Sequence, residues 1–512
     1  MSVLTPLRHD AQREWPETGA VDASIRLSRS SKMLLTGVAA LSVLAFWVVH
    51  GSLIDDAYIS LSYARNVAFH LHWGLIPQTT SNTASSPLNV LLLAALIAVL
   101  RHAVWATGVL FIGCHVVLGY CLLRTAQLRG LPTWTALAGS LLVLANPLLL
   151  SATGLEVALG AAVLGLLLLA AVQARPLMFG LIAGFAVLTR IDLVIFVLVL
   201  LVASPALRHG WRRILLGGAA VTYPWFAFSW TILGSALPDT LFIKTLQKSW
   251  GNNDFGNGPL LFLHAYQIAT ALAFVPAVLG TVSLLIRAVA HVGRRYAATQ
   301  CLSSVSALGL AGIGHYLAYT KLGVPPYHWY YGPSLISLSV FLAFASGALL
   351  PTLLAKVSHW VPAILVTLIL TGQFGFDAYH GLPWREAPIT TNWATPVDYA
   401  AAGSQLGPLI GGHAVRSPGE IGTLAYFCGC KIVDVFADRA QFVPFIDDVK
   451  QHNGTVVQWL INLNFLFLDR HAQPIPVDYT LTSTPNASVG AASWPAGSSW
   501  VGKRYLVLTA GH

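Results

Sequence analysis

The sequence predicts an all-α polytopic membrane domain followed by a small C-terminal α/β domain. Of its 512 residues, 55% are hydrophobic and 10% are charged, whereas an ordinary soluble domain is about 25% charged. Apolar runs of about 17–25 residues, the length that an α-helix needs to cross a bilayer, recur along most of the chain. After residue 372 no run is long enough to cross again. We therefore expect a cytoplasmic tail at 1–32, a transmembrane domain at 33–372 and an extracytoplasmic soluble domain at 373–512.

The distribution of charge predicts the orientation. Residues 1–32 carry both signs of charge and no cleavage site follows the first apolar run, which is typical of a cytoplasmic tail and not of a signal peptide. The net charge of +9 is spread in small groups between apolar runs, so we expect a multi-pass protein of the cell's inner (plasma) membrane, surrounded by membrane lipid, and no nucleic-acid partner.

One long outer loop is expected at 54–104, with interfacial helices that include an apolar one near 87–100. The alternative is that 87–100 is a full span. With the long loop, fifteen Lys and Arg residues fall inside and six fall outside, which the positive-inside rule favours. The six are Arg65, Arg101, Arg190, Lys244, Lys248 and Lys321.

About eleven transmembrane helices follow from this arrangement. We predict them at 33–53, 105–123, 133–152, 157–174, 177–189, 193–205, 214–233, 259–286, 302–320, 332–354 and 357–372. The short pair 177–189 and 193–205 meets at a charged corner with Arg190 and Asp192. Lipid penalises such a corner unless it faces a cavity or the outer surface.

The C-terminal domain is expected to combine short strands with helices. Strand-like composition occurs at 413–416, 423–427, 431–436 and 463–468, and helical composition at 396–406 and 444–460. The five cysteines, Cys114, Cys121, Cys301, Cys428 and Cys430, form no disulfide framework or zinc pattern. The one-residue spacing of Cys428 and Cys430 is poor for a mutual disulfide.

Two adjacent carboxylates, Asp55 and Asp56, open the first outer loop just before a helical pattern at 56–69. In a purely structural interpretation Asp55 caps this helix and Asp56 is a favourable first-turn charge. In a functional interpretation the pair supplies a general base that takes a proton from an acceptor hydroxyl.

Further charged and aromatic residues are predicted on the same side of the membrane. Arg65, Arg190, Lys244 and Lys248 could bind a phosphate, although the lysines could equally be solvated and Arg190 with Asp192 could be a scaffold ion pair. Glu156 could reach the same cavity as Asp55, or face water. The aromatic run at 327–330 forms either a headgroup-level belt or a sugar site.

The motifs in this order resemble the GT-C superfamily of polyprenyl-phosphate-sugar glycosyltransferases. The resemblance covers residues 33–350 and is carried by Asp55–Ser60 with Tyr63–Asn66, by 81–88, by Thr153–Glu156, by 186–192 and by 234–244, with a weaker echo at Pro418–Gly422. Within the superfamily the pattern is most similar to the actinobacterial arabinofuranosyltransferases that place terminal β-(1→2) arabinose on cell-wall arabinan.

The resemblance implies a polyprenyl-phosphate sugar donor, a cell-envelope glycan acceptor and a site on the outer face. Asp55 is then the base or acceptor-orienting group, and Asp56 and Glu156 assist it. The donor phosphate is held by Arg65, Arg190 and Lys244. The remaining substrate contacts are Tyr58, Asn82, Asp192, Asp239, His328 and Tyr330.

Several alternatives stay open at this stage. The enzyme could transfer mannose or another hexose instead of arabinofuranose. A lipid-linked-sugar flippase would show repeats and charged or broken helices near the bilayer midplane, whereas this chain has no repeat and places its acids at outer span ends. A non-catalytic assembly subunit leaves the acid-bearing loops unexplained. Asp55, Asp56 and Glu156 could bind a divalent cation, but no cofactor follows from three carboxylates.

Overall fold

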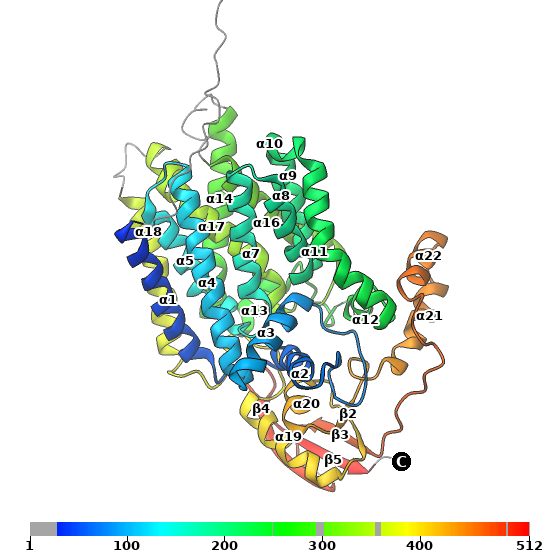
Figure 1. The fold of residues 1–512 in the computed structure, drawn as a ribbon. Coiled ribbons are helices and arrows are strands. Elements are labelled where there is room, and N and C mark those ends of the chain that lie inside the picture. The colour runs from blue at the N-terminus through cyan, green and yellow to red at the C-terminus, as the bar shows by residue number, and fades with distance from the viewer. Residues whose placement is uncertain (1–27, 248, 293–301, 354–359, 488–489, 511–512) are drawn as a thin grey trace, which may run out of the picture.

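The computed structural model describes residues 28–247, 249–292, 302–353, 360–487 and 490–510. Most of the predicted tail, together with Lys248 and Cys301, lies outside these ranges. Figure 1 shows a helical bundle with the C-terminal domain at one end. One buried apolar cluster extends through both parts and includes Leu61, Leu164 and Leu424. The two domains are therefore packed together and are not joined by a free linker.

The bundle is built from helices of very different lengths. They are α1 (Arg29–Val49), α4 (Ala103–Leu128), α5 (Thr133–Leu144), α6 (Pro147–Ser151), α7 (Val157–Val172), α8 (Pro176–Thr189), α9 (Val194–Ala203), α10 (Pro205–His209), α11 (Trp211–Ile232), α14 (Gln267–Val292), α16 (Ser303–Leu322), α17 (Gly332–Leu353) and α18 (Val361–Tyr379). Four more, α2 (Asp55–His70), α3 (Pro87–Leu100), α12 (Asp239–Gln247) and α13 (Gly258–Ala265), lie toward the end that faces the C-terminal domain (Figure 1).

Five helices among the described residues are long and apolar enough to cross a membrane. They are Arg29–Val49, Ala103–Leu128, Gln267–Val289, His328–Ala348 and Val361–Tyr379. The predicted number of about eleven spans is not confirmed, because several predicted spans are shorter or broken. The run at 133–152 breaks at Asn146, whose side chain accepts hydrogen bonds from the first N–H groups of α6. The run at 259–286 breaks at Tyr266, between α13 and α14.

The charged corner predicted at Arg190 lies between two short helices, as expected. α8 has 14 residues and α9 has 10, and the single 3₁₀ turn η1 (Ile191–Leu193) joins them. At about 1.5 Å per residue, α8 reaches only about 21 Å of the roughly 30 Å hydrocarbon thickness. A helix of this length that begins at one surface ends short of the other, so polar side chains at its end need a protein cavity.

The first loop forms the predicted helix, but Asp55 does not cap it. The N-cap of α2 is Ile54, which makes no side-chain capping bond, and Asp55 is the first helical residue. The interpretation of Asp55 as the cap of its own helix is therefore wrong. The apolar helix predicted near 87–100 is α3, with Pro87 in its first turn.

The C-terminal domain contains a five-stranded sheet with strand order β2-β1-β3-β5-β4. The strands are β1 (Ala414–Arg416), β2 (Lys431–Val433), β3 (Tyr479–Thr484), β4 (Ala492–Ser498) and β5 (Gly502–Ala510). β1 pairs parallel with β2 and β3, where Val415 lies opposite Ile432 and Tyr479, and β5 runs antiparallel to β3 and β4. The helices are α19 (Pro396–Ile410), α20 (Gly422–Cys428), α21 (Val443–Gln451) and α22 (Thr455–Asn464).

Two of the four predicted strands are wrong. Residues 423–427 belong to helix α20, and 463–468 are the end of α22 and the turns after it. In the first case the first N–H groups of α20 bind a carboxylate from the bundle, and in the second Phe465 packs on Phe442. Tertiary contacts override the local β propensity in both places. The strand at 413–416 and the helix at 396–406 are confirmed.

The structure also corrects the prediction for the C-terminal cysteines. Cys428 and Cys430 form a disulfide, and their Cα atoms are 5.1 Å apart. α20 ends at Cys428, and Gly429 follows with a left-handed φ of 61°, a conformation that residues with a Cβ rarely adopt. The turn at Gly429 brings the two sulfur atoms together, which the spacing alone did not indicate.

Candidate active site

Asp55 connects the membrane domain to the C-terminal domain. It is 4% exposed, and its carboxylate accepts hydrogen bonds from the N–H groups of Gly422 at 2.9 Å and Thr423 at 2.7 Å, the first turn of α20. A Cβ on Gly422 would collide with the backbone carbonyl of Asp55, so only glycine allows this approach. Burial raises the pKa of Asp55 to about 6, although the two N–H groups oppose the shift.

Asp56, one residue further along α2, points elsewhere. Its Oδ1 lies 3.6 Å from the Nζ of Lys244 on α12, and its side chain keeps 25% of its exposure. The Lys244 ammonium also lies over the ring of Tyr327, 4.0 Å from the centroid. Because 3.6 Å is longer than a hydrogen bond, the ammonium retains donors for a ligand.

An apolar cavity of about 380 Å³ opens on one side of this pair. Its walls come from α2, α9, α12 and α16 and are lined by apolar side chains such as Ile195, Leu241 and Leu322. The charged residues in the walls are Asp56, Glu156, Arg190, Asp192 and Lys244. Such a cavity suits a ligand with a hydrocarbon part and an anionic group.

The buried side chain of Arg190 lines the apolar cavity. Its guanidinium donates to Glu156 at 2.8 Å, to Asp192 at 2.9 Å and to the hydroxyl of Tyr319 at 3.1 Å. Asp192 also lies 2.7 Å from the Nε2 of His315. The Tyr330 ring lies 5.2 Å from the guanidinium. The structure therefore joins four predicted residues, Glu156, Arg190, Asp192 and Tyr330, in one cluster, and His315 is a member that belonged to no predicted site.

An aromatic cavity of about 410 Å³ opens on the other side of Asp56. Trp250 and Tyr327 of the membrane domain face it together with Trp393 and Trp500 of the C-terminal domain. The two cavities share four lining residues, Asp56, Ile59, Lys244 and Phe436. The carboxylate of Asp56 and the ammonium of Lys244 thus lie at the boundary between the apolar cavity and the aromatic cavity.

Glu420 is the acidic residue of the aromatic cavity that the C-terminal domain contributes. Its carboxylate accepts hydrogen bonds from the Asn392 amide at 3.1 Å, the Trp393 N–H at 3.0 Å and the Tyr399 hydroxyl at 2.5 Å. Burial and the nearby charge of Asp55 raise its pKa to about 8. The weak motif resemblance at Pro418–Gly422 is the one sequence signal that includes Glu420, whereas no motif indicates the tryptophans of this cavity.

Five predicted residues lie outside both cavities and make structural contacts. Arg65 donates to the carbonyl of Tyr426 and stacks on its ring. Tyr58 packs on Tyr426 and Phe427. The other three are Asn82, which donates to Ser229 and Ser235, Asp239, which pairs with Arg439 at 2.7 Å, and His328, which packs on Phe262.

The contacts of Arg65 and Asp239 both fasten the C-terminal domain to the bundle. Arg65 reaches α20 from α2, and Arg439 reaches the start of α12 from the C-terminal domain. Burial raises the pKa of Asp239, and Arg439 opposes that shift. These side chains hold the walls of the two cavities in place without lining them.

The three carboxylates considered for a divalent cation are held by different partners. Asp55 accepts backbone N–H groups, Asp56 faces Lys244 and Glu156 accepts from Arg190. No group of three or more His, Cys, Asp and Glu side chains with metal-binding geometry occurs among the described residues. As they stand, these three do not form one shared cation site.

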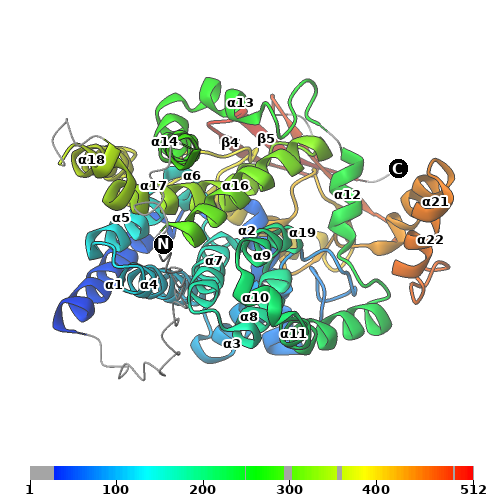
Figure 2. The same ribbon diagram turned by 90° about the horizontal axis from the view of Figure 1, so that it is seen from above.

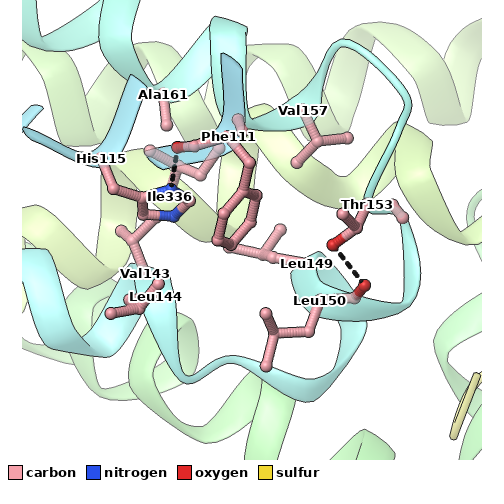
Figure 3. A pocket seen from close by; sticks show the side chains of 12 residues that line it. Phe111, His115, Val143, Leu144, Leu149, Leu150, Thr153, Val157, Ala161 and Ile336 are labelled. Atoms are coloured by element: carbon pink, nitrogen blue, oxygen red, sulfur yellow. Dashed lines mark hydrogen bonds between the residues drawn. The ribbon is translucent and has the colours of Figure 1, made fainter. Parts of the chain in front are cut away.

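A third, much smaller cavity lies among α4, α5, α6 and α7. Figure 3 shows Phe111, His115 and Thr153 around it, with His115 Nδ1 2.9 Å from the carbonyl of Phe111. Its volume is about 10 Å³, roughly the space of one water molecule. It is therefore too small for a substrate.

The overall fold of the chain is similar to that of two solved structures with TM-scores above 0.5. The chain is similar to ArnT from Cupriavidus metallidurans bound to undecaprenyl phosphate, with a TM-score of 0.56 and 14% identity over 94% of this chain and 98% of that one. It is also similar to the Archaeoglobus fulgidus oligosaccharyltransferase tethered with an acceptor peptide, with a TM-score of 0.51 and 12% identity over 89% and 69%.

No protein-family model and no curated protein matches the sequence. The mycobacterial arabinofuranosyltransferase AftD is a looser structural match, with a TM-score of 0.48 and 15% identity over 94% of this chain and 40% of that one. The likeness to the two structures with TM-scores above 0.5 therefore establishes the fold alone.

Proposed function

We propose that this chain is an integral-membrane glycosyltransferase that moves a sugar from a polyprenyl-phosphate donor to a cell-envelope glycan. The observation that carries the proposal is the meeting of the apolar and aromatic cavities at Asp56 and Lys244. A lipid-phosphate sugar needs an apolar channel with cations at its mouth, and a glycan acceptor needs aromatic faces with polar side chains. Both requirements are met on opposite sides of one carboxylate.

In this proposal the donor lies in the apolar cavity. The prenyl chain contacts Ile195, Leu241 and Leu322, and the phosphate lies near Lys244. Arg190 is already paired with Glu156 and Asp192, so its cluster orients the donor, and Lys244 provides the direct phosphate contact. As the bond from the anomeric carbon to the phosphate oxygen breaks, the polyprenyl phosphate leaves with its charge still held by the same Lys244 contact that binds the donor.

The acceptor lies in the aromatic cavity, with its reacting hydroxyl at Asp56. Asp56 takes the proton as the hydroxyl oxygen attacks the anomeric carbon. This reverses the predicted order, in which Asp55 was the base and Asp56 assisted, because both Asp55 oxygens accept hydrogen bonds from α20. Asp55 is then a positioning residue that holds the C-terminal wall of the acceptor site against α2.

Arabinofuranose is the donor sugar we favour, on the sequence resemblance alone, and mannose or another hexose is the alternative. The test is transfer from purified decaprenyl-phosphoryl arabinose or polyprenyl-phosphoryl mannose to synthetic glycan acceptors. We expect a product lengthened by one pentose. Transfer of mannose alone would identify the protein as a hexosyltransferase. If the lipid-linked sugar crossed the vesicle membrane and no product formed, the protein would be a flippase and not a glycosyltransferase.

The proposal requires that both cavities open on the outer side of the inner membrane. Residue 1 is then cytoplasmic, and Asp55, Glu156, Arg190, Lys244 and the whole of 373–512 are outside. In intact cells we expect an impermeant thiol reagent to label a cysteine placed at position 450 and to leave one at position 129 unlabelled. The reverse pattern would contradict this topology.

A further inference from the structure

The helical hairpin α21–α22, with the residues that follow it to Leu468, stands apart from the sheet of its own domain. Figure 1 shows the hairpin beside α12 and level with the end of the bundle, and Figure 2 places it outside the bundle helices. Its inner face packs on α12 in one apolar cluster, which contains Ile243, Phe442, Ile446, Ile461 and Phe465. This contact fixes the hairpin to the element that carries Lys244.

The opposite face of α22 is also apolar, and it is exposed. Val456 is 72% exposed, Trp459 61% and Leu460 50%, and the exposed apolar surface continues through Leu463, Leu466 and Phe467. Residues 454–468 contain no charged side chain. The charged residues of the hairpin, Asp447, Asp448 and Lys450, all lie on α21, where the two aspartates are exposed. A helix that is apolar on two sides needs a second apolar environment.

The exposed face of α22 is continuous with the surface of the membrane bundle. The indole N–H of Trp230 on α11 donates to the carbonyl of Leu463 at 2.8 Å, and the Trp230 ring meets the Phe467 ring edge-on at 5.3 Å. Elsewhere on α11, the apolar side chains of Phe228 and Ile232 are also exposed. The residues at the end of α22 therefore contact a bundle helix directly, and both helices expose apolar side chains beyond this contact.

We propose that α22 lies in the outer leaflet of the lipid bilayer, with Trp459 and Leu460 at the boundary between headgroups and acyl chains. An apolar helix face with tryptophan at its edge and charges on the neighbouring helix is typical of interfacial insertion. The occupant is lipid and not a second copy, because the surface extends that of a bundle that lipid already surrounds. This inference does not depend on sugar transfer. It implies that the bilayer holds α12 at headgroup level.

The test uses a fluorophore at position 459 in the full-length protein. Trp459→Cys is made in a chain that keeps the buried Cys114 and Cys121 and carries Cys301→Ser, labelled with an environment-sensitive dye and reconstituted into phosphatidylcholine and phosphatidylglycerol vesicles. Asp448→Cys on α21 is the matched control. We expect doxyl-labelled lipids to quench the dye severalfold more strongly at 459 than at 448, and aqueous iodide to quench it more strongly at 448.

Equal quenching by iodide at both positions would overturn the proposal, because α22 would then face water. Protection of position 459 from both quenchers would also overturn it, since a second copy or a partner protein would then cover the helix. Thermal unfolding of both labelled proteins, compared with that of the parent chain, verifies that each is folded. The readout is independent of activity, so a failure of the proposed transfer leaves this result interpretable.

Discussion

The two cavities that share Asp56 and Lys244 differ in the origin and the chemistry of their walls. The walls of the apolar cavity come almost entirely from the membrane domain, and Glu156, Arg190 and Asp192 form one cluster in them. The aromatic cavity is built half by the C-terminal domain, and its tryptophans lie on loops and strand ends. In the proposed function, the bundle would then recognise the lipid-phosphate part of the donor, and the C-terminal domain would recognise the acceptor.

The largest effect should come from the carboxylate that the cavities share. Asp56→Asn keeps the shape of the side chain but removes its proton-accepting charge, so we expect kcat to fall by about a hundred- to ten-thousandfold with little change in Tm. Transfer from purified donor to synthetic acceptor, with thermal unfolding in parallel, measures both quantities.

Asp55→Asn is the matched control for this comparison. It places an amide N–H₂ among the N–H groups of Gly422 and Thr423, so its main effect should be a lower Tm as the contact between α2 and α20 weakens. If Asp55→Asn abolished transfer at an unchanged Tm while Asp56→Asn kept near wild-type turnover, the assignment of the base would have to be exchanged.

Removing the ammonium of Lys244 should weaken the binding of the donor more than that of the acceptor. Lys244→Gln retains a polar side chain but loses a charge-assisted phosphate contact, and we expect the donor KM to rise by about ten- to hundredfold. The acceptor KM should change far less, because a contact kept from the ground state to the transition state appears in the KM of its own substrate. Steady-state kinetics with each substrate varied in turn will test this. A pure loss of kcat would mean that Lys244 acts on the reacting atoms and not on donor binding.

A change in the aromatic cavity should affect the acceptor KM more than the donor KM. Trp393→Ala removes one aromatic wall, and an aromatic contact of about 0.5–1.5 kcal/mol corresponds to a rise of roughly two- to tenfold in the acceptor KM. Trp393→Phe, which keeps an aromatic face, should recover most of the affinity. A larger change in the donor KM than in the acceptor KM would contradict the assignment of this cavity to the acceptor.

The sequence predicted the bundle better than it predicted the site, and the reason is physical. A long apolar run directly indicates a helix in an apolar environment, so α1, α4 and α7 lie where they were expected. The difference between Asp55 and Asp56 is not local: α2 turns one toward Gly422, 367 residues away in the chain, and the other toward Lys244. The first turn of α20 likewise depends on that distant carboxylate.

The C-terminal sheet was missed in part for a related reason. β3, Tyr479–Thr484, has a single buried residue, Leu481, and is rich in Thr and Ser, so its apolar signal is weak. Its identity as a strand comes from pairing with β5, where Leu481 lies opposite Leu508. Trp393 and Trp500 lie in the loop before α19 and in the turn between β4 and β5. Such segments have no hydrophobic periodicity, so the sequence does not single out the tryptophans of the aromatic cavity.

The smallest expected effect concerns the pH dependence of stability, to which the buried carboxyl of Glu420 contributes. The raised pKa of Glu420, about 8 against an ordinary value of 4.5, means that the folded protein holds a proton that the unfolded chain has lost between these two pH values. Stability therefore falls as pH rises across this window. Asp55, with a raised pKa of about 6, adds a contribution of the same sign at the lower end of this pH window.

Glu420→Gln keeps the shape of the protonated side chain and cannot ionise, so its Tm should fall less than that of the wild type between pH 5 and pH 8. Asp469→Asn, at an exposed position of the same domain, should keep the wild-type slope. Thermal unfolding in detergent micelles across this range measures the slopes, and a Glu420→Gln slope equal to that of the wild type would show that Glu420 is ionised throughout and that burial does not hold its proton.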